Sequence, residues 1–202
     1  MADLDKAQRH EKRMKRHKTV VDDKIKQANI DKGLLLVITG NGKGKSSSGF
    51  GMIARALGHN MRVGIVQFIK GAYSTGEETF YRRFPNEVDY HVMGDGFTWD
   101  TQNLEQDIAS AKEGWEVCKK LLSDPTIDVV LFDELNIVLK MKYLDINTVI
   151  TDLAARPDMQ HVIITGRGAP DAIIEEADTV SRIDDVKHAF RAGIKAQKGI
   201  EL

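Results

Sequence analysis

The chain has one cysteine, Cys118, which excludes an intrachain disulfide and any metal site built from several cysteines. No apolar run approaches the roughly 20 residues of a membrane-spanning helix. The charged N-terminus lacks the apolar centre of a signal peptide. The histidines show no spacing typical of metal ligands. We therefore expect a protein of the reducing cytoplasm with no membrane partner.

The chain as a whole also has no large excess of positive or negative charge. Its 29 lysines and arginines nearly balance 30 aspartates and glutamates, for a formal net charge of −1. A protein that binds nucleic acid through its overall charge is usually strongly basic, so we expect no nucleic-acid partner. The hydrophobic fraction of 42% and the length of 202 residues are ordinary for one globular domain.

Residues 1–28 form the one strongly basic segment. They contain too little apolar surface to fold unaided, and two interpretations stay open. The segment is either a solvated, partly helical tail or a stretch that becomes ordered over an anionic ligand. Its basic residues are Lys6, Arg9, Lys12, Arg13, Lys15, Arg16 and Lys18, accompanied by the single acid Glu11.

The rest of the chain, residues 29–202, alternates between predicted strands and helices. Helical patterns start at Ser46 and cover residues 104–122, 147–155 and 170–177, and Asp100 or Thr101 is a plausible cap for the second. Near-continuous apolar strands are typical of a parallel sheet that is covered on both faces. We predict one α/β domain with a largely parallel sheet and helices on both faces. The predicted strands are 34–38, 62–68, 88–93, 127–132, 161–165 and 179–183.

A glycine-rich loop joins the first strand to the first helix. Counted from Gly40, it has the pattern G-x-x-x-G-K-S, one residue shorter than the common Walker A form. Lys45 is placed to reach phosphates and Ser46 to offer its hydroxyl to Mg²⁺, while Lys43 adds a second cation. A plain turn that lets a helix pack on a strand is the alternative. The predicted phosphate-binding residues are Gly40, Asn41, Gly42, Lys43, Gly44, Lys45, Ser46 and Ser47.

Paired carboxylates end another apolar strand. Asp133 and Glu134 are predicted to lie on the same sheet edge as Lys45, where an acidic residue of P-loop proteins binds Mg²⁺ directly or through water. An acidic pair at this position can also simply cap the next helix. Together with the glycine-rich loop, the pair indicates a metal site.

Two further loops carry unusual residues. Arg167, between two glycines at the end of the fifth strand, can contact phosphate or stack on a base, or belong to an ordinary turn. Phe97 and Trp99 follow glycines in a loop before the long helix. They can fold back onto the core or form an apolar wall for a flat organic ligand.

Several of these segments, in this order and spacing, resemble the bacterial ATP:corrinoid adenosyltransferases, the P-loop type of cob(I)alamin adenosyltransferase used in cobalamin synthesis and corrinoid salvage. The resemblance covers the chain from the basic segment to the C-terminus. One departure is Ser46–Ser47, where threonines are common in the family; a hydroxyl is kept. The segments are residues 40–46, 66–71, 96–99, 133–135, 163–168 and 186–190.

The resemblance implies a RecA-like P-loop fold, usually a homodimer, in which ATP donates an alkyl group. The Co(I) of a corrinoid attacks the 5′ carbon of ATP and triphosphate leaves. Mg²⁺ or Mn²⁺ accompanies ATP, and a flavoprotein or similar reductant supplies Co(I). The nucleotide is expected to contact Arg55, Lys70, Arg167 and Gly168 in addition to the glycine-rich loop.

Roles for three side chains follow. Lys45 is expected to stabilise the charge that develops on triphosphate. Phe97 and Trp99 are candidates for an apolar wall that excludes the lower axial ligand of cobalt and eases reduction of Co(II). The family's N-terminal segment closes over the bound corrinoid, which favours the second interpretation of residues 1–28.

Three rival functions remain. A P-loop ATPase or small-molecule kinase would release ADP, and gives no role to Phe97 and Trp99. A non-catalytic nucleic-acid module would depend on residues 1–28 and on salt. A corrinoid chaperone without catalysis would leave Lys45 and Ser46 unexplained.

Overall fold

The computed structural model describes residues 2–69, 76–93 and 103–201, with side chains from residue 6 onward. The chain divides into two compact units, residues 1–32 and residues 33–202. In the first unit, helix α1 (Ala2–Gln27) is continuous. Its described side chains are exposed except for the half-buried Asp22. Whether this helix closes over a ligand stays a prediction.

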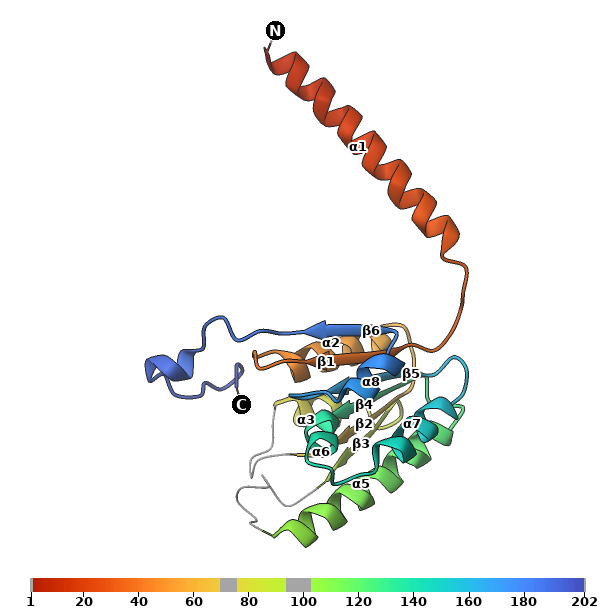
Figure 1. Ribbon diagram of the computed structural model, residues 1–202, viewed down its shortest axis with the longest axis vertical. Helices are drawn as coiled ribbons and strands as arrows, with labels where there is room; N and C mark the ends of the chain where they lie inside the picture. The colour runs from red at the N-terminus through yellow and green to blue at the C-terminus, as the bar shows by residue number, and fades with distance from the viewer. Residues whose placement is uncertain (1, 70–75, 94–102, 202) are drawn as a thin grey trace. The chain divides into compact units, whose positions relative to one another are not determined.

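The second unit is built on one six-stranded sheet in the order β3-β2-β4-β5-β1-β6 (Figure 1). Every pairing in the sheet is parallel. The predicted parallel sheet is confirmed, and each strand lies within two residues of its expected bounds. The strands are β1 (Leu35–Thr39), β2 (Val63–Gln67), β3 (Val88–Val92), β4 (Val129–Asp133), β5 (His161–Thr165) and β6 (Thr179–Arg182).

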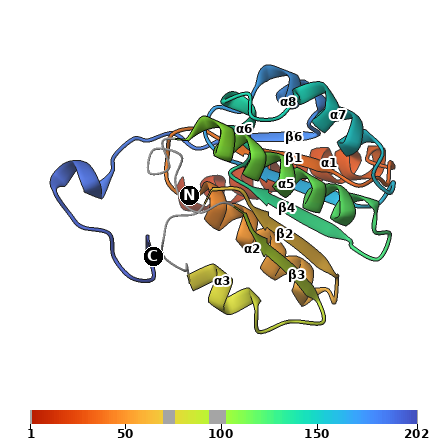
Figure 2. The same cartoon turned by 90° about the horizontal axis from the view of Figure 1, so that it is seen from below.

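Helices cover both faces of this sheet because its central strands are apolar on both sides (Figure 2). In β4, Val130 and Phe132 pack into one hydrophobic core, and Val129 and Leu131 pack into the other. The first core is covered by α5 (Leu104–Ser123), α6 (Leu135–Lys140), α7 (Ile146–Ala154) and α8 (Asp171–Glu176). The second is covered by α2 (Lys45–Gly58) and α3 (Gly76–Tyr81).

The four predicted helices of this unit correspond to α2, α5, α7 and α8. The cap predicted for the long helix is wrong, because the side chain of Asn103, not of Asp100 or Thr101, accepts a hydrogen bond from the Gln106 amide at 3.2 Å. Helices α3 and α6 and the 3₁₀ turn Ala189–Ala192 were not predicted. Elements of six residues or fewer are too short to show a helical repeat, and α8, of the same length, was predicted from Pro170 at its start. Among the described helices, none is both long and apolar enough to cross a membrane.

The close packing of α2 on the sheet depends on Gly49. A Cβ atom at this position would lie 2.8 Å from Cδ1 of Leu131 and 3.1 Å from Cγ2 of Thr165. At Gly51, on the exposed side of the same helix, a Cβ atom would meet nothing within 4 Å. Overpacking typically costs about 1–3 kcal/mol, whereas alanine in an open helical position gains about 0.5–1 kcal/mol over glycine.

We therefore expect Gly49→Ala to lower the free energy of unfolding and Gly51→Ala to raise it, both measured by urea denaturation. The two variants add the same methyl group to one helix, so each controls for the other. Equal effects of the two changes would contradict this account of how α2 packs.

Candidate active site

The glycine-rich loop is shaped by the segment that follows β6. Gly40 has φ 103°, and a Cβ atom there would lie 2.3 Å from the carbonyl oxygen of Ile183. The Gly42 amide donates a hydrogen bond to the same oxygen at 2.8 Å. Gly44, with φ 110°, then leads into α2. Only glycine accepts such a backbone and such a close approach, so the short loop is anchored to its neighbouring strand.

Lys45 is the first residue of α2 and its side chain is buried, with 6% of the residue exposed. Its Nζ donates a hydrogen bond to the Gly42 carbonyl at 2.6 Å, which fixes the ammonium group inside the loop. Burial lowers the pKa of Lys45 below its ordinary value; the charge of Glu134 opposes this shift, and that of Arg167 adds to it. A buried cation held in this way is placed to meet an anionic ligand.

Asp133, the last residue of β4, is held by both neighbouring strands. Its Oδ1 accepts a hydrogen bond from Thr165 Oγ1 at 2.6 Å, and its Oδ2 accepts one from Gln67 Nε2 at 3.0 Å. Tyr90 donates to Gln67 Oε1 at 2.7 Å and extends the network to β3. Since Asp133 is only 3% exposed, these bonds compensate for the burial of its carboxylate.

Glu134 follows in the left-handed conformation, with φ 63° and ψ 15°, and precedes α6. Its amide donates to Thr165 Oγ1 at 3.1 Å, whereas its Oε2 is buried without a hydrogen-bond partner. Burial raises the pKa of Glu134 to about 7, and the negative charge of Asp133 adds to this shift. The positive charges of Lys45 and Arg167 oppose it. Positive φ in residues other than glycine is uncommon and concentrates at functional sites.

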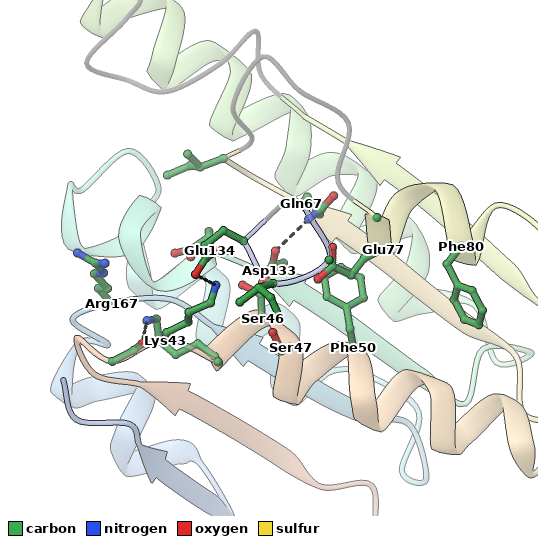
Figure 3. A pocket seen from close by; sticks show the side chains of 18 of the residues that line it. Lys43, Ser46, Ser47, Phe50, Gln67, Glu77, Phe80, Asp133, Glu134 and Arg167 are labelled. Atoms are coloured by element: carbon green, nitrogen blue, oxygen red, sulfur yellow. Dashed lines mark hydrogen bonds and ion pairs between the residues drawn. The ribbon is translucent and has the colours of Figure 1, made fainter. Parts of the chain in front are cut away.

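These groups meet in one cavity of about 660 Å³ (Figure 3). Loop and α2 residues form one side, and the paired carboxylates another. In the view of Figure 3, Arg167 lies toward one end and Phe80 toward the other. The predicted residues that line the cavity are Gly42, Lys43, Gly44, Lys45, Ser46, Ser47, Asp133, Glu134 and Arg167.

Other predicted residues are placed elsewhere. Gly40 and Asn41 lie in the loop without lining the cavity. Arg55 does not reach it, because it lies ten positions after Lys45 in α2, about 15 Å along the helix. It lines a small hollow beside His161, the first residue of β5. Gly168 lines a second, neighbouring cavity. Lys70, Phe97 and Trp99 lie outside the described residues.

The cavity also contains residues that were not predicted as site residues, although Gln67 and His188 lie in two of the segments that carry the family resemblance. Gln67 ends a strand at the same edge as Asp133, so its polar side chain after an apolar strand was an available signal. Glu77 and Phe80 come from the unpredicted α3. His188 and Glu201 come from the C-terminal segment, and Glu201 Oε1 lies 3.9 Å from Lys43 Nζ. No local pattern indicated that this segment returns to the loop.

The chemistry of the cavity suits a hard divalent cation shared with a ligand. Within the described ranges, no group of three or more histidine, cysteine, aspartate or glutamate residues could hold a metal alone. Asp133, Glu134 and Ser46 nevertheless line one cavity, and Glu134 Oε2 lacks a hydrogen-bond partner. Mg²⁺ is commonly bound by one or two carboxylates together with substrate phosphates, so these residues fit the ion.

Comparison with known proteins identifies the family. The family model for ATP:corrinoid adenosyltransferase BtuR/CobO/CobP matches residues 31–202. The chain belongs to this family. A corrinoid adenosyltransferase of Pseudomonas aeruginosa is 63% identical over 198 residues, covering 98% of both chains. One from Escherichia coli K12 is 47% identical over 194 residues, covering 96% of this chain and 98% of the relative.

The solved structures support the fold. The flagellar accessory protein FlaH of Methanocaldococcus jannaschii superposes with a TM-score of 0.50, over 76% of this chain and 72% of FlaH. Its sequence identity of 14% makes this a likeness of fold alone. The expected RecA-like P-loop architecture is confirmed. As predicted, the glycine-rich loop joins the first strand, β1, to α2.

The raised pKa of Glu134 predicts a specific dependence of stability on pH. Between its ordinary value of 4.5 and about 7, the folded protein keeps a proton that the unfolded chain releases. The free energy of unfolding therefore falls as pH rises through this range. We expect the stability of the native protein relative to Glu134→Gln to fall by about 2 kcal/mol between pH 5 and pH 8.

Urea denaturation without nucleotide or divalent cation measures this difference. Glu176→Gln, at an exposed position of α8, is the control variant. A stability difference between the native protein and Glu134→Gln that does not change with pH would contradict the raised pKa.

Proposed function

We propose that this protein transfers the 5′-deoxyadenosyl group of ATP to the Co(I) of cob(I)alamin or a related corrinoid and releases triphosphate. The observation that carries the proposal is one cavity in which the short loop, the buried Lys45 and the paired carboxylates meet, in a chain of this family. The corrinoid adenosyltransferases of P. aeruginosa and E. coli align with nearly the whole chain. An ATPase or kinase function has no comparable support.

In the proposed reaction, the cobalt lone pair attacks C5′ of ATP. A cobalt–carbon bond forms as the bond from C5′ to the triphosphate oxygen breaks, and cobalt passes formally from Co(I) to Co(III). Triphosphate leaves with the electron pair of the broken bond. No general base is needed, since the nucleophile has no proton to lose.

Positively charged residues of the cavity would stabilise the triphosphate leaving group. Lys45 is fixed by its hydrogen bond to Gly42 and offers its charge without rearrangement. Lys43 and Arg167 line the same cavity and add positive charge. Such preorganised cations stabilise charge that develops in the transition state more than charge already present in the ground state.

Mg²⁺, or Mn²⁺ in its place, supplies further positive charge to the polyphosphate when bound. Ser46, Asp133 and Glu134 would hold it. Both oxygens of Asp133 already accept hydrogen bonds, whereas Oε2 of Glu134 is buried without a hydrogen-bond partner.

The remaining proposals rest on the family resemblance. The protein acts in the cytoplasm as a homodimer, in cobalamin synthesis or corrinoid salvage, and receives Co(I) through a flavoprotein or similar reductant. Residues 1–28 close over the bound corrinoid. Lys70 stays in the proposal as a nucleotide contact on resemblance alone, whereas Arg55 lies away from the cavity and is not proposed as one.

The decisive test is anaerobic incubation with Mg-ATP and chemically reduced cob(I)alamin. We expect adenosylcobalamin and one equivalent of triphosphate. Absorbance measures the corrinoid product, and analysis of the phosphate products measures triphosphate. Lys45→Ala is expected to lower kcat/KM by about 100-fold or more, while Lys120→Ala, on the exposed side of α5, has no effect. ADP and phosphate with unchanged corrinoid would refute adenosyl transfer and favour a phosphoryl-transfer enzyme.

A second test concerns Phe97 and Trp99, proposed as the wall that excludes the lower axial ligand. Replacing both by polar residues should impair assays that start from Co(II) and a reductant more than assays that start from Co(I), because the wall acts on reduction. The Co(I) assay is the internal control. Equal losses in both assays would contradict the role.

A further inference from the structure

A second cavity of about 700 Å³ lies beside the first and has no role in the proposed reaction so far. It is formed by α5, the C-terminal end of α6, the turn leading to α7 and the loop after β5. Its apolar wall contains the buried Leu139 and Leu144 and the partly buried Ile108 and Ile146. Such a wall accepts the apolar part of an organic ligand.

Three exposed lysines surround this wall. Lys112 comes from α5, Lys140 from the last turn of α6, and Lys142 from the turn after it. None of them pairs with a carboxylate among the described residues. Three ammonium groups around one cavity favour a ligand that carries negative charge.

The nearby carboxylates do not neutralise these lysines by direct pairing. Asp145 caps α7, accepting hydrogen bonds from the amide of Thr148 at 3.1 Å and from its hydroxyl at 2.8 Å. Asp107 is hydrogen-bonded to the side chain of Tyr143. Asp145 is therefore engaged with neutral groups and Asp107 with Tyr143, and no ion pair joins the three lysines to a carboxylate of the described residues.

Consecutive residues connect the two cavities. Arg167 lines the first cavity and Gly168 lines the second. Gly168 has φ 68°, and a Cβ atom there would lie 2.8 Å from Cδ and 3.3 Å from Nζ of Lys140. The glycine thus lets the side chain of Lys140 lie against the loop after β5, whose consecutive residues line the two cavities.

We propose that the second cavity binds an anionic group on the periphery of the corrinoid, a carboxylate or a phosphodiester, while the reaction takes place in the first. This inference rests on the proposed function. Corrinoids are wide macrocycles whose edges carry methyl groups together with amide or carboxylate side chains, and they differ in charge there. Cobyrinic acid a,c-diamide carries free carboxylates, cobalamin carries a phosphodiester, and the side chains of cobinamide are neutral. The lysines would favour binding of cobyrinic acid a,c-diamide and cobalamin over binding of cobinamide.

The test is equilibrium binding of these three corrinoids, as Co(II) forms with Mg-ATP, to the full chain. The test variant is Lys112→Gln with Lys140→Gln; Lys142 is left unchanged because its φ of 60° makes that turn sensitive to substitution. The control is Lys119→Gln with Lys120→Gln, which removes the same charge from α5 outside both cavities.

We expect the test variant to raise Kd at least about tenfold for the anionic corrinoids and less than twofold for cobinamide. An effect on cobyrinic acid a,c-diamide alone would identify a carboxylate site, and an effect on cobalamin alone a phosphodiester site. Unchanged Kd, equal increases for all three corrinoids, or the same pattern in the control variant would overturn the inference. Binding is measured without turnover, so failure of the proposed function would show separately, as absence of triphosphate.

Discussion

The site depends on the burial of one carboxylate, that of Asp133, between hydrogen-bond donors from two neighbouring strands. An isolated carboxylate buried in an apolar core would be strongly destabilising. Here Gln67 and Thr165 satisfy one oxygen each, and Tyr90 fixes the amide of Gln67. The ends of β2, β4 and β5 are thereby connected to each other and to the middle of β3 through side chains, and the floor of the cavity is fixed before any ligand binds.

This network also explains why Glu134 differs from its neighbour. Thr165 Oγ1 accepts a hydrogen bond from the Glu134 amide and donates one to Asp133, so the backbone turns sharply at the end of β4. The turn leaves Glu134 in a left-handed conformation with one carboxylate oxygen buried and unpartnered. The two adjacent acids therefore differ: both oxygens of Asp133 accept hydrogen bonds, whereas one oxygen of Glu134 has no hydrogen-bond partner.

The glycine-rich loop obeys a second constraint, the close passage of the chain after β6. Gly40 and Gly42 lie so near to Ile183 and Asp184 that larger residues would displace the backbone. On the other side, Gly168 lets Lys140 approach the loop after β5. Glycines at these two boundaries set the shape of the nucleotide cavity and its proximity to the lysine-lined cavity, which connects the proposed reaction to the proposed choice of corrinoid.

The sequence by itself determined the sheet, the main helices and the central part of the site. Apolar strands such as 129–133 are unmistakable, and the carboxyl ends of parallel strands meet at one edge, so Lys45, Asp133 and Glu134 could be placed together from order alone. The family could be predicted because several motifs occur in a fixed order.

Only the tertiary structure decided what depends on contacts between distant segments. Strand order brought Gln67 opposite Asp133 in register, and the C-terminal segment brought Glu201 to Lys43. Arg55 shows the converse: the resemblance implied a nucleotide contact, but the length of α2 carries it to the other end of the sheet. Local patterns report which face of an element is apolar, whereas the three-dimensional path of the chain determines which side chains share a cavity.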